Sequence, residues 1–195
     1  MAIAADSALL VIDVQQGFDD ASFWGPRNNP AAEDNIAALM DAWQATGRPV
    51  VQVRHASLRP GSVLAADHPG HAFKDIVEKR RYESLLITKH VNSAFYGTPD
   101  LAAWLTARGI GQVVVAGIQT NMCVETTARM AGNLGYDVLL PLDATHTFDL
   151  AGPAGLSLTA DELATATAVN LQGGGFARVV TTAQLLSASG AQLTA

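Results

Sequence analysis

The stretch that decides the fold is residues 112–135, which read QVVVAGIQTNMCVETTARMAGNLG. The stretch begins with a β-branched apolar run at residues 113–115, which is typical of a strand buried on both faces of a parallel sheet. The single cysteine of the chain, Cys123, lies where this strand gives way to a helix of small residues. A thiol at a helix N-terminus meets the positive end of the peptide dipoles, so we expect the position to favour the thiolate. The alternative is that Cys123 is simply a small buried hydrophobe.

Short apolar runs recur along the rest of the chain and predict further strands. They lie at residues 8–12, 50–53, 85–88, 136–140 and 177–181. Segments with helical spacing separate these runs, so strands and helices alternate throughout. This alternation predicts a three-layer α/β/α fold built on a mostly parallel, Rossmann-like sheet of about six strands.

Helix starts are marked by local capping signals. A capping residue followed by proline predicts a start at Asn29-Pro30 and another at Thr98-Pro99. Thr159 and Glu162 have the spacing of a capping box, which predicts a helix from there to about residue 171. Residues 54–82 lack a clear periodicity and are predicted to be mostly loop with one short helix.

Composition narrows the class of protein. The chain has 195 residues, of which 49% are hydrophobic and 15% charged, so we expect one compact domain over residues 1–195. A formal net charge of −6 without a basic run disfavours a nucleic-acid partner. No apolar run reaches membrane-spanning length, and the first residues do not resemble a signal peptide. One cysteine cannot form an intrachain disulfide, and a cytoplasmic location is expected.

Three of the predicted strands end in chemically useful residues, namely Asp13, Lys89 and Cys123. Carboxyl ends of parallel strands meet at one edge of the sheet, where open α/β sheets bind ligands. A carboxylate, an ammonium and a thiol that converge there are suited to act as base, orienting charge and nucleophile. Structural alternatives exist, because Asp often ends strands by bonding the backbone and a terminal Lys often extends to solvent.

The sequence also resembles the isochorismatase-like cysteine hydrolases, a family that includes nicotinamidases and N-carbamoylsarcosine amidases. The resemblance is carried by LLVIDVQQGF, ITKHVNSAFYGT and VVVAGIQTNMCVETTARMAGNLGYDVLLPLDAT, and it extends over nearly the whole chain. It implies that Asp13, Lys89 and Cys123 form a catalytic triad. It further implies a cis peptide at Ile118-Gln119, which aims the backbone N–H groups of Gln119 and Cys123 at one point as an oxyanion hole.

The expected function is therefore cysteine-dependent hydrolysis of a C–N bond in a small amide, ureide or lactam through a thioester. We expect no cofactor and no metal, and the individual substrate is left open. The residues expected to form the pocket wall are Phe18, Trp24, Asn92, Phe95 and Met122. The family resemblance also favours a homo-oligomer in which a partner chain can complete the pocket.

Two other functions remain open at this stage. Nicotinamidases bind a metal through an Asp-x-His segment, but here the matching place reads Val53-Arg54-His55 and lacks the carboxylate. His68 and His71 follow at a spacing that is no established zinc pattern, and the roles of all three histidines are left open. A non-catalytic binding member of the family is the second alternative, which the retained Asp-Lys-Cys set disfavours. True isochorismatases lack the nucleophilic cysteine, so Cys123 disfavours vinyl-ether hydrolysis.

Overall fold

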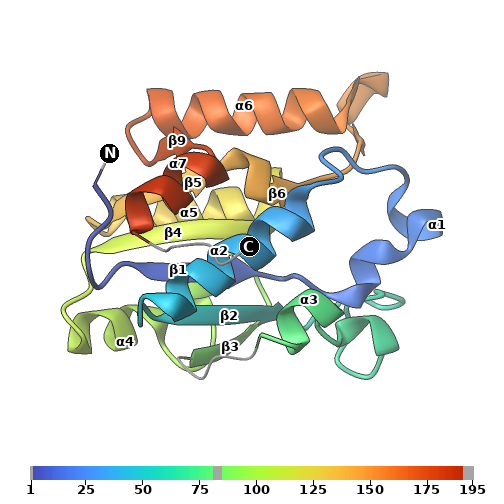
Figure 1. Cartoon of the computed structure of the whole chain (residues 1–195). Coiled ribbons are helices and arrows are strands. Elements are labelled where there is room, and N and C mark those ends of the chain that lie inside the picture. Colours follow the sequence, from blue (N-terminus) through green and yellow to red (C-terminus); the bar gives the residue numbers. More distant parts are fainter. Residues whose placement is uncertain (1, 81–84, 191–195) are drawn as a thin grey trace.

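The computed structural model describes residues 2–80 and 85–190, and its centre is a parallel sheet (Figure 1). The strand order is β3-β2-β1-β4-β5-β9, and every neighbouring pair is parallel. The strands are β1 (Ala8–Ile12), β2 (Val50–His55), β3 (Leu85–Lys89), β4 (Gln112–Ile118), β5 (Asp137–Pro141) and β9 (Arg178–Val180). The predicted α/β architecture on a mostly parallel sheet is confirmed.

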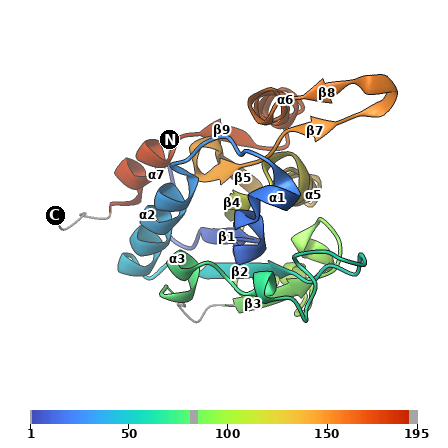
Figure 2. The same ribbon diagram turned by 90° about the vertical axis from the view of Figure 1, so that its right-hand side faces the viewer.

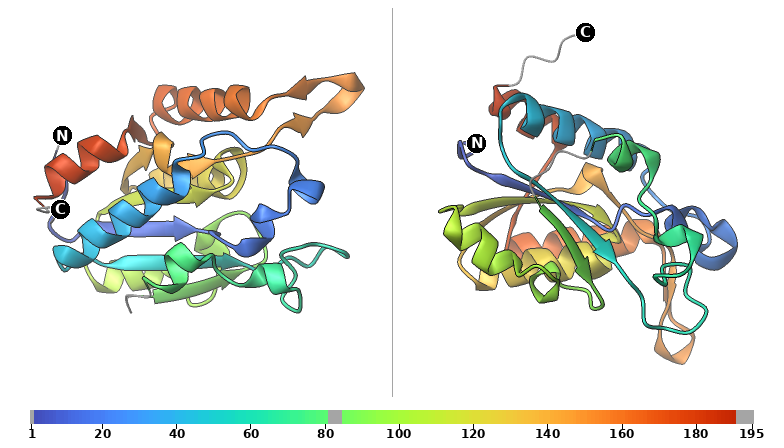
Figure 3. Two further views of the ribbon diagram at one scale, coloured as in Figure 1. Left: turned by 45° about the vertical axis from the view of Figure 1, so that its right-hand side comes forward. Right: turned by 90° about the horizontal axis from the view of Figure 1, so that it is seen from below.

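Helices cover both faces of this sheet (Figures 1 and 3). One face packs against α2 (Ala32–Ala45), α3 (Asp75–Glu78) and α7 (Thr182–Ser189). The other packs against α4 (Leu101–Ala107), α5 (Glu125–Asn133) and α6 (Ala160–Gly173). Along β1, Leu9 and Val11 enter the first core, whereas Leu10 and Ile12 enter the second. Because both faces are buried, the strands read as continuous apolar runs in the sequence.

The predicted start of α2 is wrong by two residues. The helix begins at Ala32, and its N-cap is Ala31 rather than Asn29. Asn29 adopts a positive φ of 44°, and its side-chain amide donates to the carbonyl oxygens of Asp143 and Thr145 at 2.9 and 2.6 Å. Its polar side chain therefore fastens the preceding loop to a distant segment instead of capping the helix.

The predicted start of α4 at Thr98-Pro99 is also wrong. That peptide bond is cis, and the helix begins at Leu101. Asp100 is the N-cap, and its carboxylate accepts a hydrogen bond from the N–H of Ala103 at 3.0 Å. By contrast, the capping box predicted at the start of α6 is confirmed, with both of its reciprocal hydrogen bonds present.

Several short elements were not predicted. They are α1 (Ala21–Trp24), β6 (Thr145–His146), and an antiparallel hairpin of β7 (Leu150–Ala151) and β8 (Ser157–Leu158). The hairpin projects from the body of the molecule (Figure 2). The predicted loop 54–82 holds a 3-10 turn at Pro69–His71 and the short helix α3, and its last two residues lie outside the described part of the chain. Within that part, no helix combines the length and apolar character needed to cross a bilayer.

The strand order reverses between β1 and β4, which is where open α/β sheets bind their ligands. The ends of these two strands approach each other closely at Gly117, which has a φ of 127°. A Cβ atom on Gly117 would lie 2.1 Å from the carbonyl oxygen of Ile12, so only glycine fits there. This approach brings Asp13 next to the segment that follows β4, in which the Ile118–Gln119 peptide bond is cis.

Candidate active site

The three strand-end residues singled out by the sequence lie in contact with one another. Asp13 follows β1, Lys89 ends β3, and Cys123 lies in a π-helical turn (Thr120–Val124) that leads into α5. The Nζ atom of Lys89 is 2.6 Å from Asp13 Oδ2 and 3.3 Å from Cys123 Sγ. Asp13 and Lys89 are fully buried, and Cys123 is 9% exposed. A carboxylate, an ammonium and a thiol therefore share one nearly solvent-free site.

His55 joins this group from β2, the strand between β3 and β1. It pairs in register with Lys89, and its Nδ1 atom lies 3.3 Å from Lys89 Nζ. The buried side chain of Gln15 donates to the carbonyl oxygen of His55 at 3.0 Å and accepts from its N–H at 2.8 Å. Neither Gln15 nor His55 was assigned a role from the sequence. His55 was missed because the strand was predicted to end at residue 53, whereas β2 extends to His55.

The expectation that the helix terminus favours the thiolate is wrong for the resting site. Burial, together with the adjacent Asp13 carboxylate, raises the pKa of Cys123, and the Lys89 ammonium does not reverse this effect. Burial would lower the pKa of Lys89, but Asp13 and Cys123 raise it, so the ammonium is retained. Burial and the neighbouring Lys89 ammonium lower the pKa of His55. A neutral imidazole can therefore accept a hydrogen bond from Lys89.

A protonated thiol needs a base before it can act as a nucleophile. The carboxylate of Asp13 is in a position to be that base. Its Oδ2 atom is bound to Lys89, whereas its Oδ1 atom is buried and has no hydrogen-bond partner among the described residues. An oxygen of Asp13 lies within 4.8 Å of the Cys123 sulfur. A buried acceptor without a partner costs free energy, and such groups are concentrated at functional sites.

Three residues of this group carry side chains that can ligate a metal. Asp13, His55 and Cys123 each offer a ligand-type atom, and these atoms lie within 4.8 Å of one another. However, the Lys89 ammonium lies among them, at 2.6 to 3.3 Å from one such atom of each residue. Val53, at the place where the nicotinamidase pattern has a carboxylate, is fully buried in the apolar core. The position that a metal would take is held by an ammonium, so these residues do not fit a metal ion.

The other two histidines of residues 54–82, His68 and His71, lie outside this group. His68 is the N-cap of the 3-10 turn that follows it, and its Nδ1 atom accepts a hydrogen bond from the N–H of Gly70 at 2.9 Å. The carbonyl oxygen of His71 accepts a second hydrogen bond from Gln15 at 2.9 Å. Both histidines therefore have structural contacts in the loop beside the site.

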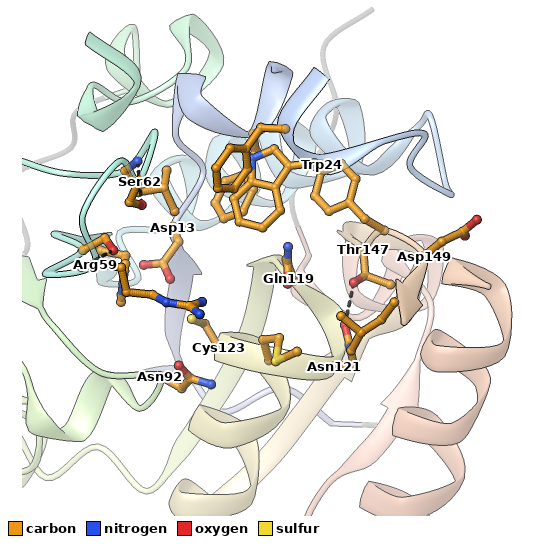
Figure 4. Close-up of a pocket in the computed structure, with 18 of the residues that line it drawn as sticks. Asp13, Trp24, Arg59, Ser62, Asn92, Gln119, Asn121, Cys123, Thr147 and Asp149 are labelled. Carbon is orange, nitrogen blue, oxygen red and sulfur yellow. Dashed lines mark hydrogen bonds between the residues drawn. The ribbon is translucent and has the colours of Figure 1, made fainter. Parts of the chain in front are cut away.

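A cavity of about 600 Å³ opens beside this group of residues (Figure 4). Asp13, His55 and Cys123 form part of its lining. Its volume suits a small-molecule ligand. Four of the five residues predicted for the pocket wall line it, namely Phe18, Trp24, Asn92 and Met122. Phe95 is not among the residues that line this cavity. Its ring stacks against Tyr136 at 5.8 Å between centroids, where it packs against the core on the α4 and α5 side of the sheet.

Aromatic rings form one wall of the cavity. The centroids of Phe18, Trp24 and Phe148 are 5.0 to 6.1 Å apart, and Phe23 packs edge-on against Trp24 at 4.8 Å. The indole N–H of Trp24 donates to the carbonyl oxygen of Gly17 at 2.8 Å, which fixes its orientation. Phe148 was missed because it follows β6, a two-residue strand too short to leave a periodic signal.

Polar groups from the turn after β4 line the cavity floor. Gln119 lines the cavity and directly follows the cis peptide bond at the end of β4. Asn121 also lines it, and its side-chain oxygen accepts a hydrogen bond from the Thr147 hydroxyl (Figure 4). The oxyanion hole of Gln119 and Cys123 stays a prediction.

A parallel α/β fold with a thiol, a carboxylate and an ammonium at its switch point is the architecture of a cysteine-type hydrolase. The chain belongs to the isochorismatase family, because the model of the isochorismatase domain matches residues 7–184. It is thus an isochorismatase-family hydrolase.

Individual relatives agree with this assignment. The isochorismatase family protein YrdC of Bacillus subtilis is 44% identical over 73% of this chain and 75% of its own length. A streptothricin hydrolase of Streptomyces noursei is 35% identical over 81% of this chain and 61% of its own length. A solved isochorismatase-family structure from Chromobacterium violaceum superposes with a TM-score of 0.90, covers 97% of each chain and is 44% identical.

Proposed function

We propose that this protein hydrolyses a C–N bond of a small amide, ureide or lactam through a thioester on Cys123. The observation that carries the proposal is the contact group at the sheet edge. Lys89 bridges Asp13 and Cys123 at 2.6 and 3.3 Å, while the second oxygen of Asp13 has no partner among the described residues. The relative named streptothricin hydrolase supports a hydrolytic reaction.

In the first half of the reaction, Asp13 accepts the proton of the Cys123 thiol as the sulfur attacks the substrate carbonyl carbon. The carbonyl oxygen becomes an oxyanion, to which the N–H groups of Gln119 and Cys123 donate. Asp13 then passes the proton to the leaving nitrogen, the C–N bond breaks, and an amine departs. The acyl group stays on the sulfur as a thioester.

In the second half, Asp13 removes a proton from a water molecule, whose oxygen attacks the thioester carbon. The C–S bond breaks, and the sulfur regains the proton from Asp13 as the acid leaves. Throughout, Lys89 stays an ammonium that holds the Asp13 carboxylate in place and stabilises negative charge on the sulfur. Its raised pKa supports that role. The raised pKa of Cys123 supports general-base activation over a preformed thiolate.

A panel of small amides, ureides and lactams, assayed for release of amine, tests this proposal. We expect turnover of at least one class by the wild-type protein and a loss of roughly 10⁴-fold or more in Cys123→Ala, as is typical when a nucleophile is removed. Circular dichroism of the variant checks that the fold is kept. Near-full activity of Cys123→Ala would exclude the covalent route, and binding without turnover would favour the non-catalytic alternative.

A further inference from the structure

Arg59 is held over the cavity by a rigid turn. The sequence Arg59-Pro60-Gly61-Ser62 is typical of a type II turn, with proline second and glycine third. Gly61 has the required positive φ of 73°, and the N–H of Ser62 donates to the carbonyl oxygen of Arg59 at 3.2 Å. The Arg59 N–H in turn donates to the hydroxyl of the buried Ser57 at 3.2 Å.

This turn is also anchored to the body of the protein. A Cβ atom on Gly17 would lie 2.6 Å from the carbonyl oxygen of Val63, and one on Gly70 would lie 2.4 Å from the same oxygen. Both glycines thus let the loop pack directly on the segment after β1. The loop that carries Arg59 therefore packs, through Val63, on the segment that carries Phe18 and Trp24 of the aromatic wall.

The guanidinium of Arg59 enters the cavity without a partner. In Figure 4 the side chain extends from the loop toward Cys123, and Arg59 is one of the residues that line the cavity. Among the described residues, its side chain forms no ion pair and no hydrogen bond. An arginine presents a planar set of donors that matches a carboxylate in a bidentate geometry.

The other charged groups of the cavity do not satisfy Arg59. Asp13 is bound to Lys89 at 2.6 Å. Asp149 accepts a hydrogen bond from the N–H of Ala160 at 2.7 Å, and in Figure 4 it lies on the opposite side of the cavity from Arg59. One cation near the thiol is thus left for a ligand, and the aromatic wall of Phe18, Trp24 and Phe148 faces the same space.

From this arrangement we infer that Arg59 selects substrates, and that they are small amides carrying a carboxylate on an apolar scaffold. The inference rests on the proposed function and names the substrate class of the same site. The guanidinium binds the substrate carboxylate, the aromatic wall contacts the scaffold, and the amide carbonyl is left beside Cys123. Arg59 is thereby a specificity-determining residue, and the chemistry on the sulfur does not require it.

A matched pair of probes tests the inference. 4-Carbamoylbenzoate carries the carboxylate, and 4-methylbenzamide is its neutral counterpart of similar shape. Binding of each is measured by calorimetry with Cys123→Ala, in which no turnover can interfere, and again after Arg59→Gln is added. Arg108→Gln is the control, because Arg108 stacks on Trp104 at 4.2 Å on α4, away from the cavity.

We expect Cys123→Ala to bind the acid roughly 10- to 100-fold more tightly than the neutral amide, as hydrogen bonds to charged groups predict. Arg59→Gln should abolish this preference, and Arg108→Gln should keep it. In the otherwise wild-type protein, Arg59→Gln should raise KM for the acid by a similar factor and bring the ratio of kcat/KM between the acid and the neutral amide close to one.

The possible failures can be told apart. Equal or undetectable binding of the two probes, or a preference that survives Arg59→Gln, overturns the role of Arg59 whatever the enzyme hydrolyses. Absence of turnover across the whole amide panel overturns the proposed function, and the binding measurement on Cys123→Ala still decides whether Arg59 recognises a carboxylate. An equal loss on both probes in Arg59→Gln shows a structural role instead.

Discussion

Two buried lysines lie in charged clusters of this molecule, and the clusters differ in how completely their charges are paired. Lys74 donates to Asp19 and Glu33, each at 2.7 Å, and Glu33 also accepts from the guanidinium of Arg27. Lys89 donates to Asp13 at 2.6 Å, to Cys123 at 3.3 Å, and lies 3.3 Å from His55. Each cluster also includes a histidine. His55, which is half-buried, lies beside Lys89, and the buried His146 lies 3.5 Å from Glu33.

The difference is in what remains free for chemistry. Both oxygens of Glu33 have cationic partners, and the Lys74 cluster fastens loop segments to α2. Its second carboxylate, Asp19, is largely exposed and lies outside the lining of the cavity beside Cys123. At Lys89, one oxygen of Asp13 has no partner within the described part of the chain, and the sulfur beside it lines a cavity. Incomplete pairing weakens the fold, and in the proposed mechanism it leaves Asp13 available as a base and Cys123 as a nucleophile.

The largest difference between the two clusters is expected when one carboxylate in each is replaced by an amide and kcat is measured. Asp13→Asn removes the base, so kcat for the best amide of the panel should fall by roughly 10³-fold or more, with the fold retained. Asp19→Asn, the matched change beside Lys74, should leave kcat within about threefold of the wild type, because its carboxylate does not line the cavity. Steady-state rates of both variants give the comparison. Similar losses in the two variants would remove the distinction between the clusters.

Replacing each lysine should show a second difference between the clusters, in the free energy of unfolding that each variant loses. Lys89→Met leaves the buried Asp13 carboxylate without its cation, which should lower the free energy of unfolding by about 3–5 kcal/mol and also abolish turnover. Lys74→Met should cost less, about 1–3 kcal/mol, because Glu33 keeps its contact with Arg27, and it should retain activity. Urea unfolding together with steady-state rates distinguishes the two outcomes. A fully active Lys89→Met protein would contradict the role given to the ammonium.

A smaller effect is expected at acid pH, where the Lys74 cluster should contribute less to the free energy of unfolding. Burial alone would raise the pKa of Glu33, but His146, Arg27 and Lys74 bring it well below the ordinary value of 4.5. A folded-state pKa below the unfolded one contributes stability above about pH 4.5, which is lost as the pH falls. The difference in unfolding free energy between wild type and Glu33→Gln should therefore shrink from pH 7 to pH 3, whereas Asp67→Asn, at an exposed side chain, serves as the control. A constant difference across this range would rule out the linkage.

The fold and the meeting of Asp13, Lys89 and Cys123 at one sheet edge could be predicted, because both leave local signals in the sequence. Fully buried parallel strands leave continuous apolar runs, and the end of such a run locates Asp13, Lys89 and Cys123 at one sheet edge. The capping box of Thr159 and Glu162 is equally local and was found. The predictions of an oxyanion hole and of a homo-oligomer go beyond what these local signals decide, and they stay predictions.

Other features depend on contacts between distant segments, and the sequence alone did not reveal them. Phe148 joins the aromatic wall through β6, and Arg59 reaches the cavity through the packing of its loop on Gly17 and Gly70. Phe95 follows an apparently suitable strand, yet its ring turns toward Tyr136 and away from the cavity lining. Burial and the adjacent Asp13 carboxylate raise the pKa of Cys123, and neither effect could be seen in the local sequence around the helix terminus.

The most direct test is the mass of the intact protein during turnover of the fastest amide of the panel. After rapid acid quench, the wild-type protein should gain the mass of the acyl group on Cys123, while Cys123→Ala gains nothing and Asp13→Asn accumulates the adduct far more slowly. Steady hydrolysis by the wild-type protein with no acyl adduct, together with an active Cys123→Ala variant, would contradict the account.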